Sequence, residues 1–306
     1  MADAMNTLAG VLNLGDANID FEVTNLLQDT PVLGMLAAVP SSHGLAHKYL
    51  RETVAASAGF RAINAGLTNT ASQDEVVTVA LNFLDASWED DVAIVKAMAT
   101  GKGGADAYVA RRAIKSIKAA LVGIEKQWFY GTDAGGFDGL ETLTQAAMTV
   151  LAGTPGTTAA EQTSAYFIRT GPEDAAIVYN GDNDGTIEVD EVRKSSAVDG
   201  SGDKYSTYRQ DIDGYLGAQA GNIYTLGRVA NIETAFDDDD ISNVLALFPA
   251  GKGPSFIAMT RKAQKLLQQS RTATNPTGFP APFPTEAFGV PIVITDQIAE
   301  TEAIVV

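Results

Sequence analysis

The sequence contains no cysteine, only two histidines and few basic residues. The absence of cysteine excludes disulfide bonds, thiolate nucleophiles, cysteine-ligated zinc and iron–sulfur clusters. Because His43 and His47 are the only histidines, a histidine-rich metal centre or a serine–histidine–aspartate triad has few places to form. The 21 lysines and arginines stand against 38 acidic residues, a formal charge of −17. This balance argues against a general nucleic-acid binder and against an anionic membrane surface as partner.

Long hydrophobic runs are also absent. The apolar stretch of residues 32–39 is about half of the roughly 20 residues that a helix needs to cross a bilayer. Near the N-terminus, Asp3 stands where a secretory signal has its basic start. We therefore expect a protein without a membrane partner. Its 306 residues, 45% of them hydrophobic, suffice for one large domain or two smaller ones.

Two segments near the N-terminus lack the pattern of an ordinary compact fold. Residues 1–40 alternate short apolar groups with Asp and Asn, and Pro31 and Pro40 interrupt them, so we expect an arm that orders against a neighbouring surface. Residues 48–79 favour two strands joined by a long loop rich in Gly, Ala and Asn. A loop of that length either contacts a partner or belongs to an ordinary long hairpin.

The strongest periodic element spans residues 105–129. Apolar side chains recur there at steps of three or four residues, which predicts a helix about 35–40 Å long: Val109, Ala113, Ile117, Leu121, Ile124 and Trp128. Another face of this helix is basic, and it is either a solvated face or a face toward a partner: Arg111, Arg112, Lys115 and Lys118. Shorter helices are predicted over residues 90–98, 140–151, 241–248 and 261–269. Strands are predicted over residues 165–169, 176–179, 204–209, 223–229, 255–259 and 288–296.

Catalytic signatures are few. The sequence has no Gly-x-Ser-x-Gly elbow, no complete phosphate-binding loop and no His-Glu-x-x-His motif. Residues 101–104, Gly-Lys-Gly-Gly, lack the strand and the Lys-Ser/Thr ending of a phosphate-binding loop. The two histidines have no third metal ligand nearby. The four aspartates of residues 237–240 more simply cap a helix than act as carboxylates in glycoside hydrolysis.

Residues 180–191 give the one specific local match, to the calcium-binding loop template. The candidate ligands are Asn180, Asp182, Asp184, Thr186 and Glu191. Because asparagine replaces the usual first aspartate and both flanks look extended, we favour an acidic turn that holds no ion. We expect neither a metal nor a cofactor.

Four stretches together resemble the major capsid proteins of tailed bacteriophages, which have the Hong Kong 97-type shell fold: residues 60–66, 105–140, 205–232 and 288–296. Residues 211–217 depart from the pattern, because relatives often carry a Trp-rich segment there. The resemblance implies an α+β fold with these parts: an N-terminal arm (1–44), an extended β-hairpin loop (45–82), a peripheral domain with a long spine helix (83–130), an axial domain with mixed sheet and helices (131–253), a return segment of the peripheral domain (254–285), and a closing strand with a C-terminal tail (286–306).

The resemblance also implies a function. The chain would be a non-enzymatic major capsid protein that self-assembles through hexamers and pentamers into the icosahedral head shell of a tailed phage. Assembly, by way of a procapsid, would occur in the host cytoplasm and end in the virion. The implied partners are a separate scaffolding protein, a portal, in some phages a decoration protein, and packaged double-stranded DNA, which Arg111, Arg112, Lys115 and Lys118 would contact without sequence specificity.

Two other functions remain open, and one family reaction does not fit. The alternatives are an encapsulin-like nanocompartment shell and, more remotely, a hydrolytic enzyme. In the cross-linking branch of the fold, a loop lysine bonds an asparagine of a neighbouring subunit. Lys48 is the only lysine between Ser41 and Leu81, far along the chain from the loop centre, so we expect no such bond.

Overall fold

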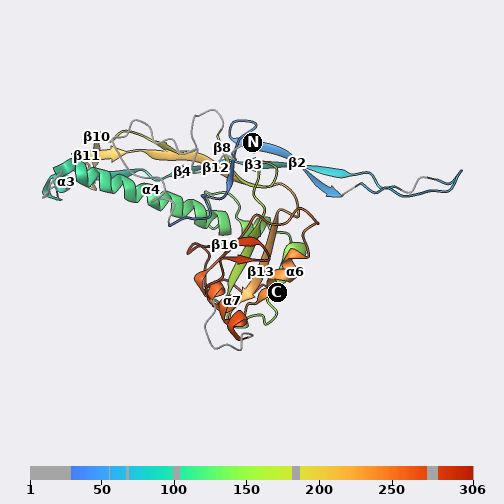
Figure 1. Ribbon diagram of the computed structural model, residues 1–306. Coiled ribbons are helices and arrows are strands. Elements are labelled where there is room, and N and C mark those ends of the chain that lie inside the picture. The colour runs from blue at the N-terminus through green and yellow to red at the C-terminus, as the bar shows by residue number, and fades with distance from the viewer. Residues whose placement is uncertain are drawn as a thin grey trace, which may run out of the picture.

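The computed structural model describes residues 29–54, 56–66, 69–98, 104–180, 187–273 and 282–305. The chain forms an elongated upper body around the long helix α4 (Gly104–Tyr130) and a lower body around a six-stranded sheet (Figure 1). A hairpin of β2 (Ala46–Val54) and β3 (Gln73–Ala80) extends far beyond both bodies (Figure 1). Among the described residues, every helix is too short or too polar to span a membrane.

Helix α4 confirms the helix predicted over residues 105–129. Its apolar stripe is buried, with Ile117, Leu121 and Trp128 at most 1% exposed. The stripe packs on a sheet with the strand order β1 (Ala37–Pro40), β8 (Ala175–Tyr179), β12 (Ile212–Ala220) and β4 (Asn82–Asp85), and β9 (Glu188–Val189) pairs with β12. This contact forms the core of the upper body.

The end of the upper body opposite the β2–β3 hairpin is a three-stranded sheet with a short helix. The sheet contains β10 (Arg193–Val198), β11 (Lys204–Gln210) and β5 (Trp88–Asp91), and α3 (Val92–Met98) follows β5. The predicted helix 90–98 begins two residues late, because Asp90 and Asp91 pair with Tyr208 and Thr207 in the β-ladder. Main-chain pairing there outweighs local helix propensity.

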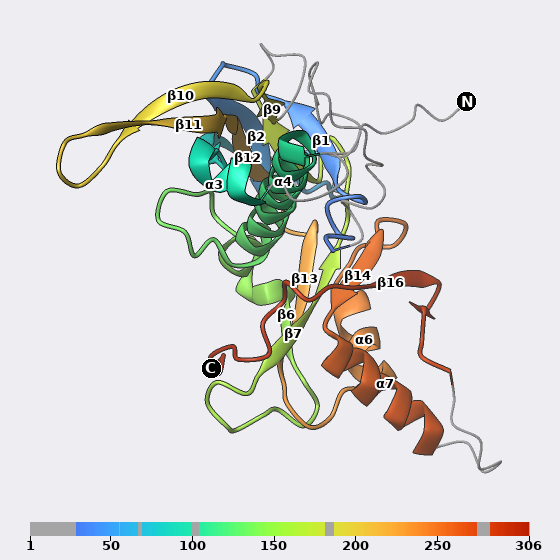
Figure 2. The same ribbon diagram turned by 90° about the vertical axis from the view of Figure 1, so that its left-hand side faces the viewer.

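The lower body has the strand order β15 (Glu286–Ala287), β16 (Val290–Ile294), β14 (Phe256–Met259), β7 (Thr163–Ile168), β13 (Leu226–Ile232) and β6 (Thr149–Leu151). Every residue of β7 and β13 is buried. Helices α6 (Asp238–Leu245) and α7 (Arg261–Ala273) lie against this sheet (Figure 2). Because β14 lies between β7 and β16, residues 256–273 belong to this body rather than beside α4.

Helices α6 and α7 of the lower body are both capped at their N-termini. The Asp237 carboxylate accepts hydrogen bonds from the backbone N–H groups of Asp239 and Asp240, so the acidic run 237–240 caps α6 as predicted. Thr260 Oγ1 accepts the N–H of Ala263 at 3.1 Å at the start of α7. These contacts satisfy donors that a helix leaves free in its first turn.

The helix predicted over residues 140–151 is wrong. The structure has a single turn, α5 (Leu140–Leu143), then a 3-10 turn, η1 (Ala146–Met148), and then strand β6. Gln145 is extended, with φ −67° and ψ 144°, and β6 pairs in parallel with β13 from Thr149 opposite Arg228. The pairing with a distant strand overrides the local apolar pattern.

The structure differs from the sequence prediction in two further places. Strand β12 was not predicted, because its sequence Ile-Asp-Gly-Tyr-Leu-Gly-Ala-Gln-Ala has few strongly strand-forming residues, yet it pairs with three strands. Residues 29–40, predicted as part of an arm, pack instead into the core of the upper body of their own chain. Val32, Leu33 and Leu36 are fully buried in the upper core, and β1 pairs in parallel with β8. Residues 1–28 of the predicted arm lie outside the described residues.

Candidate assembly surfaces

Exposed apolar side chains concentrate on the β2–β3 hairpin. Phe60 and Ile63 near its tip have exposed fractions of 112% and 93%. Leu50 and Val76, which face each other across the two strands, are 67% and 63% exposed. Contiguous apolar side chains in water mark a surface that contacts another molecule, and an isolated two-stranded hairpin is only marginally stable. The hairpin therefore has the properties of a surface that binds a partner.

The tip of this hairpin has a defined local structure. The N–H of Ala65 donates to the carbonyl oxygen of Ala62 at 3.1 Å, which closes a tight turn. Arg61 Nη1 donates to the carbonyl oxygen of Ala65 at 2.8 Å across the same turn. Further along the stem, the N–H of Ser57 donates to the carbonyl oxygen of Thr70 at 2.9 Å. These bonds order the backbone that carries the exposed apolar side chains.

The base of the hairpin is fixed to the upper body. The Tyr49 hydroxyl donates to the carbonyl oxygen of Ala220, at the end of β12, at 2.8 Å. Burial raises the pKa of Tyr49, more than this hydrogen bond and nearby Arg51 lower it, so the hydroxyl keeps its proton and remains a donor. The N–H of Leu81 donates to the carbonyl oxygen of Leu45 at 2.9 Å. The hairpin is thus an anchored extension, as the long-loop interpretation requires.

The predicted basic face of α4 is partly neutralised. Arg112 Nε lies 3.1 Å from Asp90 Oδ2, and Lys118 Nζ lies 3.4 Å from Asp29 Oδ2. Arg111 and Lys115 are exposed and form no ion pair with any described residue. Arg111, Arg112, Lys115 and Tyr108 line a small cavity of about 180 Å³. The structure therefore brings the four predicted basic residues to one face and leaves two of them open to an anion.

The predicted calcium loop is only partly described. Asp182, Asp184 and Thr186 lie outside the described residues, whereas Asn180 directly follows β8 and Glu191 is exposed two residues after β9. Both flanks are therefore strands, as expected, and Glu191 does not start a helix. Within the described ranges, no group of three or more acidic or histidine side chains could hold a metal ion.

The histidines have separate surroundings. His43 Nδ1 lies 2.9 Å from Ser42 Oγ at the exposed start of the hairpin. His47 is 9% exposed, and burial lowers its pKa, so it is neutral at physiological pH. Of the candidate phosphate loop, residues 101–103 lie outside the described residues, and Gly104 begins α4.

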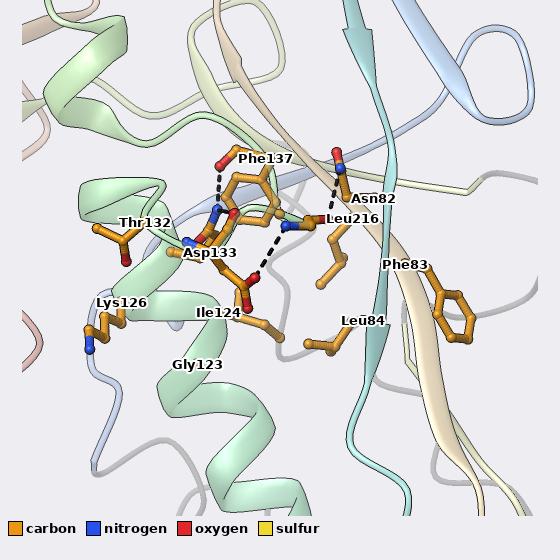
Figure 3. A pocket seen from close by; sticks show the side chains of 13 residues that line it. Asn82, Phe83, Leu84, Gly123, Ile124, Lys126, Thr132, Asp133, Phe137 and Leu216 are labelled. Atoms are coloured by element: carbon orange, nitrogen blue, oxygen red, sulfur yellow. Dashed lines mark hydrogen bonds between the residues drawn. The ribbon is translucent and has the colours of Figure 1, made fainter.

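A pocket of about 460 Å³ lies between α4, β4 and the loop after α4 (Figure 3). Gln127 orders this loop, since its Nε2 donates to the Phe137 carbonyl oxygen at 2.6 Å and its Oε1 accepts the N–H of Asp133 at 3.0 Å. Asp133 and Lys126 are the only charged residues in its lining. Asp133 Oδ1 accepts the N–H of Gly135 at 3.2 Å within its own loop. The pocket is thus lined by apolar side chains, Leu84, Ile124 and Leu216 among them, together with these two charged residues.

The sequence interpretation did not identify a buried ionic network between the two bodies. Arg228 on β13 and Glu302 near the C-terminus are 4% and 6% exposed, with Nη2 and Oε2 3.0 Å apart. Ser164 Oγ also donates to Glu302, and the Tyr130 hydroxyl at the end of α4 donates to its other oxygen at 2.6 Å. Burial, together with the Glu302 charge, raises the pKa of Tyr130 far above its usual value. No local pattern marks these residues, because their partners are 64 to 172 positions away.

The profile of one protein family, described as major capsid protein GP7, matches residues 16–306. Among solved structures, bacteriophage Epsilon15 superposes with a TM-score of 0.68 at 18% identity, over 100% of this chain and 98% of that chain. The bacteriophage JBD30 capsid gives 0.48 at 7% identity, over 86% and 88%. The SrpI encapsulin of Synechococcus elongatus PCC 7942 gives 0.44 at 12% identity, over 72% and 97%. No curated protein matches.

Proposed function

This chain belongs to the major capsid protein GP7 family and is a capsid protein, and we propose that its copies close into the icosahedral head shell of a tailed phage around double-stranded DNA. The α+β fold of the Hong Kong 97 type, expected from the sequence, is confirmed by the superposition on Epsilon15. The chain is therefore a component of the virion capsid. Family membership also favours this function over an encapsulin-like shell.

The observation that supports assembly most directly is the β2–β3 hairpin. Its fully exposed Phe60 and Ile63 lie near a hydrogen-bonded tip. The hairpin itself extends far from both bodies of its own chain (Figure 1). Burying two such side chains on another copy stabilises the contact by about 1.5–3 kcal/mol each. The hairpin therefore lies against an adjacent copy of the same chain, and each copy both gives and receives one such contact.

The finer organisation forms part of the same proposal. Copies associate as hexamers and pentamers in the host cytoplasm, with a separate scaffolding protein, a portal and, in some phages, a decoration protein. The proposed peripheral domain contains α4, within residues 83–130, and the proposed axial domain of residues 131–253 contributes β6, β7, β13 and α6 to the lower body. Arg111 and Lys115, assisted by Arg112 and Lys118, make weak contacts with packaged DNA through its phosphates, which need no sequence specificity. The subunit acts as a structural protein and not as an enzyme.

The turn of residues 180–191 acts without a bound ion in this proposal. Asp and Asn side chains stabilise such turns by bonding to their own backbone. Calcium titrated into assembled particles then gives no saturable heat at micromolar concentration. Saturable heat that disappears in an Asp184→Ala variant would show instead that the turn is a calcium site.

Substitution of the tip tests the proposed function. The full-length double variant Phe60→Ser, Ile63→Ser is expected to fold, because both side chains lie outside the core, and to form no shells by negative-stain electron microscopy. The matched control, Phe60→Leu with Ile63→Val, keeps the apolar surface and is expected to assemble. Normal shells from the serine variant would refute the role of the hairpin. A wild-type chain that remains a 32.0 kDa monomer even when it is produced together with the proposed scaffolding protein would refute the shell itself.

A further inference from the structure

Three basic side chains and a tyrosine gather on one short stretch of α4. They follow the i, i+3, i+4, i+7 spacing that places side chains on one face of a helix: Tyr108, Arg111, Arg112 and Lys115. The four residues line a cavity of about 180 Å³ in the half of α4 that lies beside α3 (Figure 1). We name this cavity the basic pocket.

The basic pocket concentrates positive charge on an otherwise acidic chain. The sequence has only 21 basic residues and a formal charge of −17, yet three of the basic residues fall within positions 111–115. Arg111 and Lys115 are four positions apart on the helix, a spacing at which like charges repel each other. Both side chains are exposed, and neither forms an ion pair with any described residue. An anion bound between them offsets this repulsion.

Asp90, on β5, orients two side chains of the basic pocket. Its Oδ2 lies 3.1 Å from Arg112 Nε and accepts a hydrogen bond from the Tyr108 hydroxyl at 3.4 Å. The Asp90 side chain is 16% exposed, and its backbone is held in the β-ladder opposite Tyr208. Arg112 and Tyr108 are therefore ordered when the chain folds, so a ligand that meets them loses less binding energy in immobilising them.

The charges and the size of the basic pocket indicate which anion it takes. Its three cations and the Asp90 carboxylate leave two net positive charges. A terminal phosphoryl group carries about −1.5 to −2 charges at pH 7, whereas each internal phosphate of DNA carries a single one. Arginine and lysine are the side chains that proteins use to bind phosphate. The cavity is smaller than the sites of drug-sized ligands, which begin at about 300 Å³, and suits one phosphoryl group.

We propose that the basic pocket binds a terminal phosphoryl group, with Arg111, Arg112 and Lys115 as its ligands and Asp90 as a positioning residue. The chemistry is that of a phosphate monoester or of free inorganic phosphate. This site goes beyond the weak contact with packaged DNA proposed above, because the internal phosphates of DNA lack the second charge. All four residues belong to one chain, so binding does not require assembly.

The test measures the binding of inorganic phosphate to the full-length protein by phosphorus NMR titration, at about 0.15 M salt, where distant charges are screened. Wild type is expected to bind phosphate saturably. The double variant Arg111→Gln, Lys115→Gln removes two exposed ligands and is expected to lower the affinity at least about tenfold. Wild type without saturable binding, or a double variant that binds as wild type does, overturns the inference.

Variants of Asp90 test its positioning role. Asp90→Ala frees Arg112 and Tyr108 and is expected to lower the affinity about fivefold, although it removes a negative charge. Asp90→Asn keeps an oxygen acceptor for Arg112 and loses the repelling charge, so it should bind at least as tightly as wild type. The matched control Asp106→Ala removes an exposed acid from the first turn of α4 that does not line the pocket, and should stay within about twofold of wild type. Tighter binding by Asp90→Ala would show that Asp90 acts only through its charge, which overturns the positioning role.

Two oligonucleotides distinguish the sources of the phosphoryl group. A short oligothymidine with a 5′-phosphate and the same molecule without it are titrated into wild type. Binding that needs the 5′-phosphate supports the inference with a nucleic-acid end as the source, and binding of free phosphate alone supports it with a small solute as the source. Equal binding of both oligonucleotides would show that internal phosphates suffice, which overturns the preference for a terminal group.

The inference and the proposed function fail separately. Electron microscopy of the same preparations, made with the scaffolding protein present, reports assembly while the titration reports binding. Shells whose subunits bind no phosphate refute this inference alone. A chain that binds phosphate but never assembles refutes the proposed function alone.

Discussion

The carboxylate of Glu125, on the buried face of α4, accepts a hydrogen bond from the hydroxyl of Thr295, 170 residues further along the chain. Its second oxygen accepts the N–H of Leu33 at 3.4 Å. One side chain thus joins the long helix to the segment before β1 and to the end of β16. Glu125 has no exposed surface and forms no ion pair with any described residue. Burial, only partly offset by these hydrogen bonds, raises its pKa from 4.5 to about 7.

We expect Glu125 to make stability depend on pH. Between pH 4.5 and about 7 the folded chain holds a proton on this group that the unfolded chain has released. The protonated Glu125 thereby adds up to about 3 kcal/mol to the free energy of unfolding. This contribution is complete below the pKa of Glu125 in the unfolded chain and is lost as the pH rises through its pKa in the folded chain. Urea unfolding from about pH 5 to pH 7.5 should therefore show a steeper fall for wild type than for Glu125→Gln, whose amide does not titrate. Parallel pH profiles for the two proteins would contradict this account.

The Arg228–Glu302 pair allows a matched comparison of a buried and an exposed partner. Glu302→Gln leaves the Arg228 guanidinium buried without its full counter-charge, and we expect it to lower the free energy of unfolding by about 3–5 kcal/mol. Glu141 lies 3.4 Å from the same guanidinium, but its side chain is 43% exposed, so Glu141→Gln should cost less than about 1 kcal/mol. Equal effects of the two substitutions in chemical denaturation would disprove the role of burial.

Two glycines of the α4 region should respond to alanine in opposite directions. Gly131 has φ +60°, and a β-carbon there would lie 2.5 Å from the backbone nitrogen of Gly139, so we expect Gly131→Ala to destabilise the fold by about 2 kcal/mol or more. Gly123 lies inside α4, and apart from its chain neighbours and the nearby helix backbone no atom lies within 4 Å of its β-carbon position. Gly123→Ala should therefore stabilise the protein by about 0.5–1 kcal/mol. Urea denaturation measures both values, and a shared sign would contradict the expectation.

We expect shells of this protein to lack covalent cross-links through the hairpin. Lys48 is the only lysine between Ser41 and Leu81, and it lies near the base of the hairpin, away from Phe60 and Ile63. A lysine–asparagine bond at the tip therefore has no amine to form it. Particles boiled in detergent should migrate as a single band of 32.0 kDa. A ladder of oligomers in the same gel would require another cross-linking residue.

Elements with strong short-range patterns could be predicted from the sequence. The apolar stripe of α4 recurs every three or four residues, and the acidic run at residues 237–240 caps α6, as expected. Strands β2 and β3 also follow the expected pattern. In each case the determining interactions join residues close in sequence, or follow a period that one face of the element imposes. The resemblance to capsid proteins added the family, which no single motif determines.

Elements stabilised by distant partners could not be predicted. Residues 149–151 form a strand because β13 is available for parallel pairing, and β12 forms because three strands flank it. Residues 29–40 resemble an arm in sequence, but α4 and β8 supply the apolar surface that buries them. Their own composition does not specify that surface.

The exposed surfaces and the buried charges show the same difference between local and distant interactions. The sequence by itself determined the length of α4, the long hairpin, the helix caps and the absence of cysteine chemistry, because these depend on composition or on neighbours a few residues apart. Only the tertiary structure decided that Glu125 and Arg228 are buried and that Phe60 and Phe288 are exposed. Burial depends on which distant segments pack around a side chain, and the residue type alone does not determine those segments.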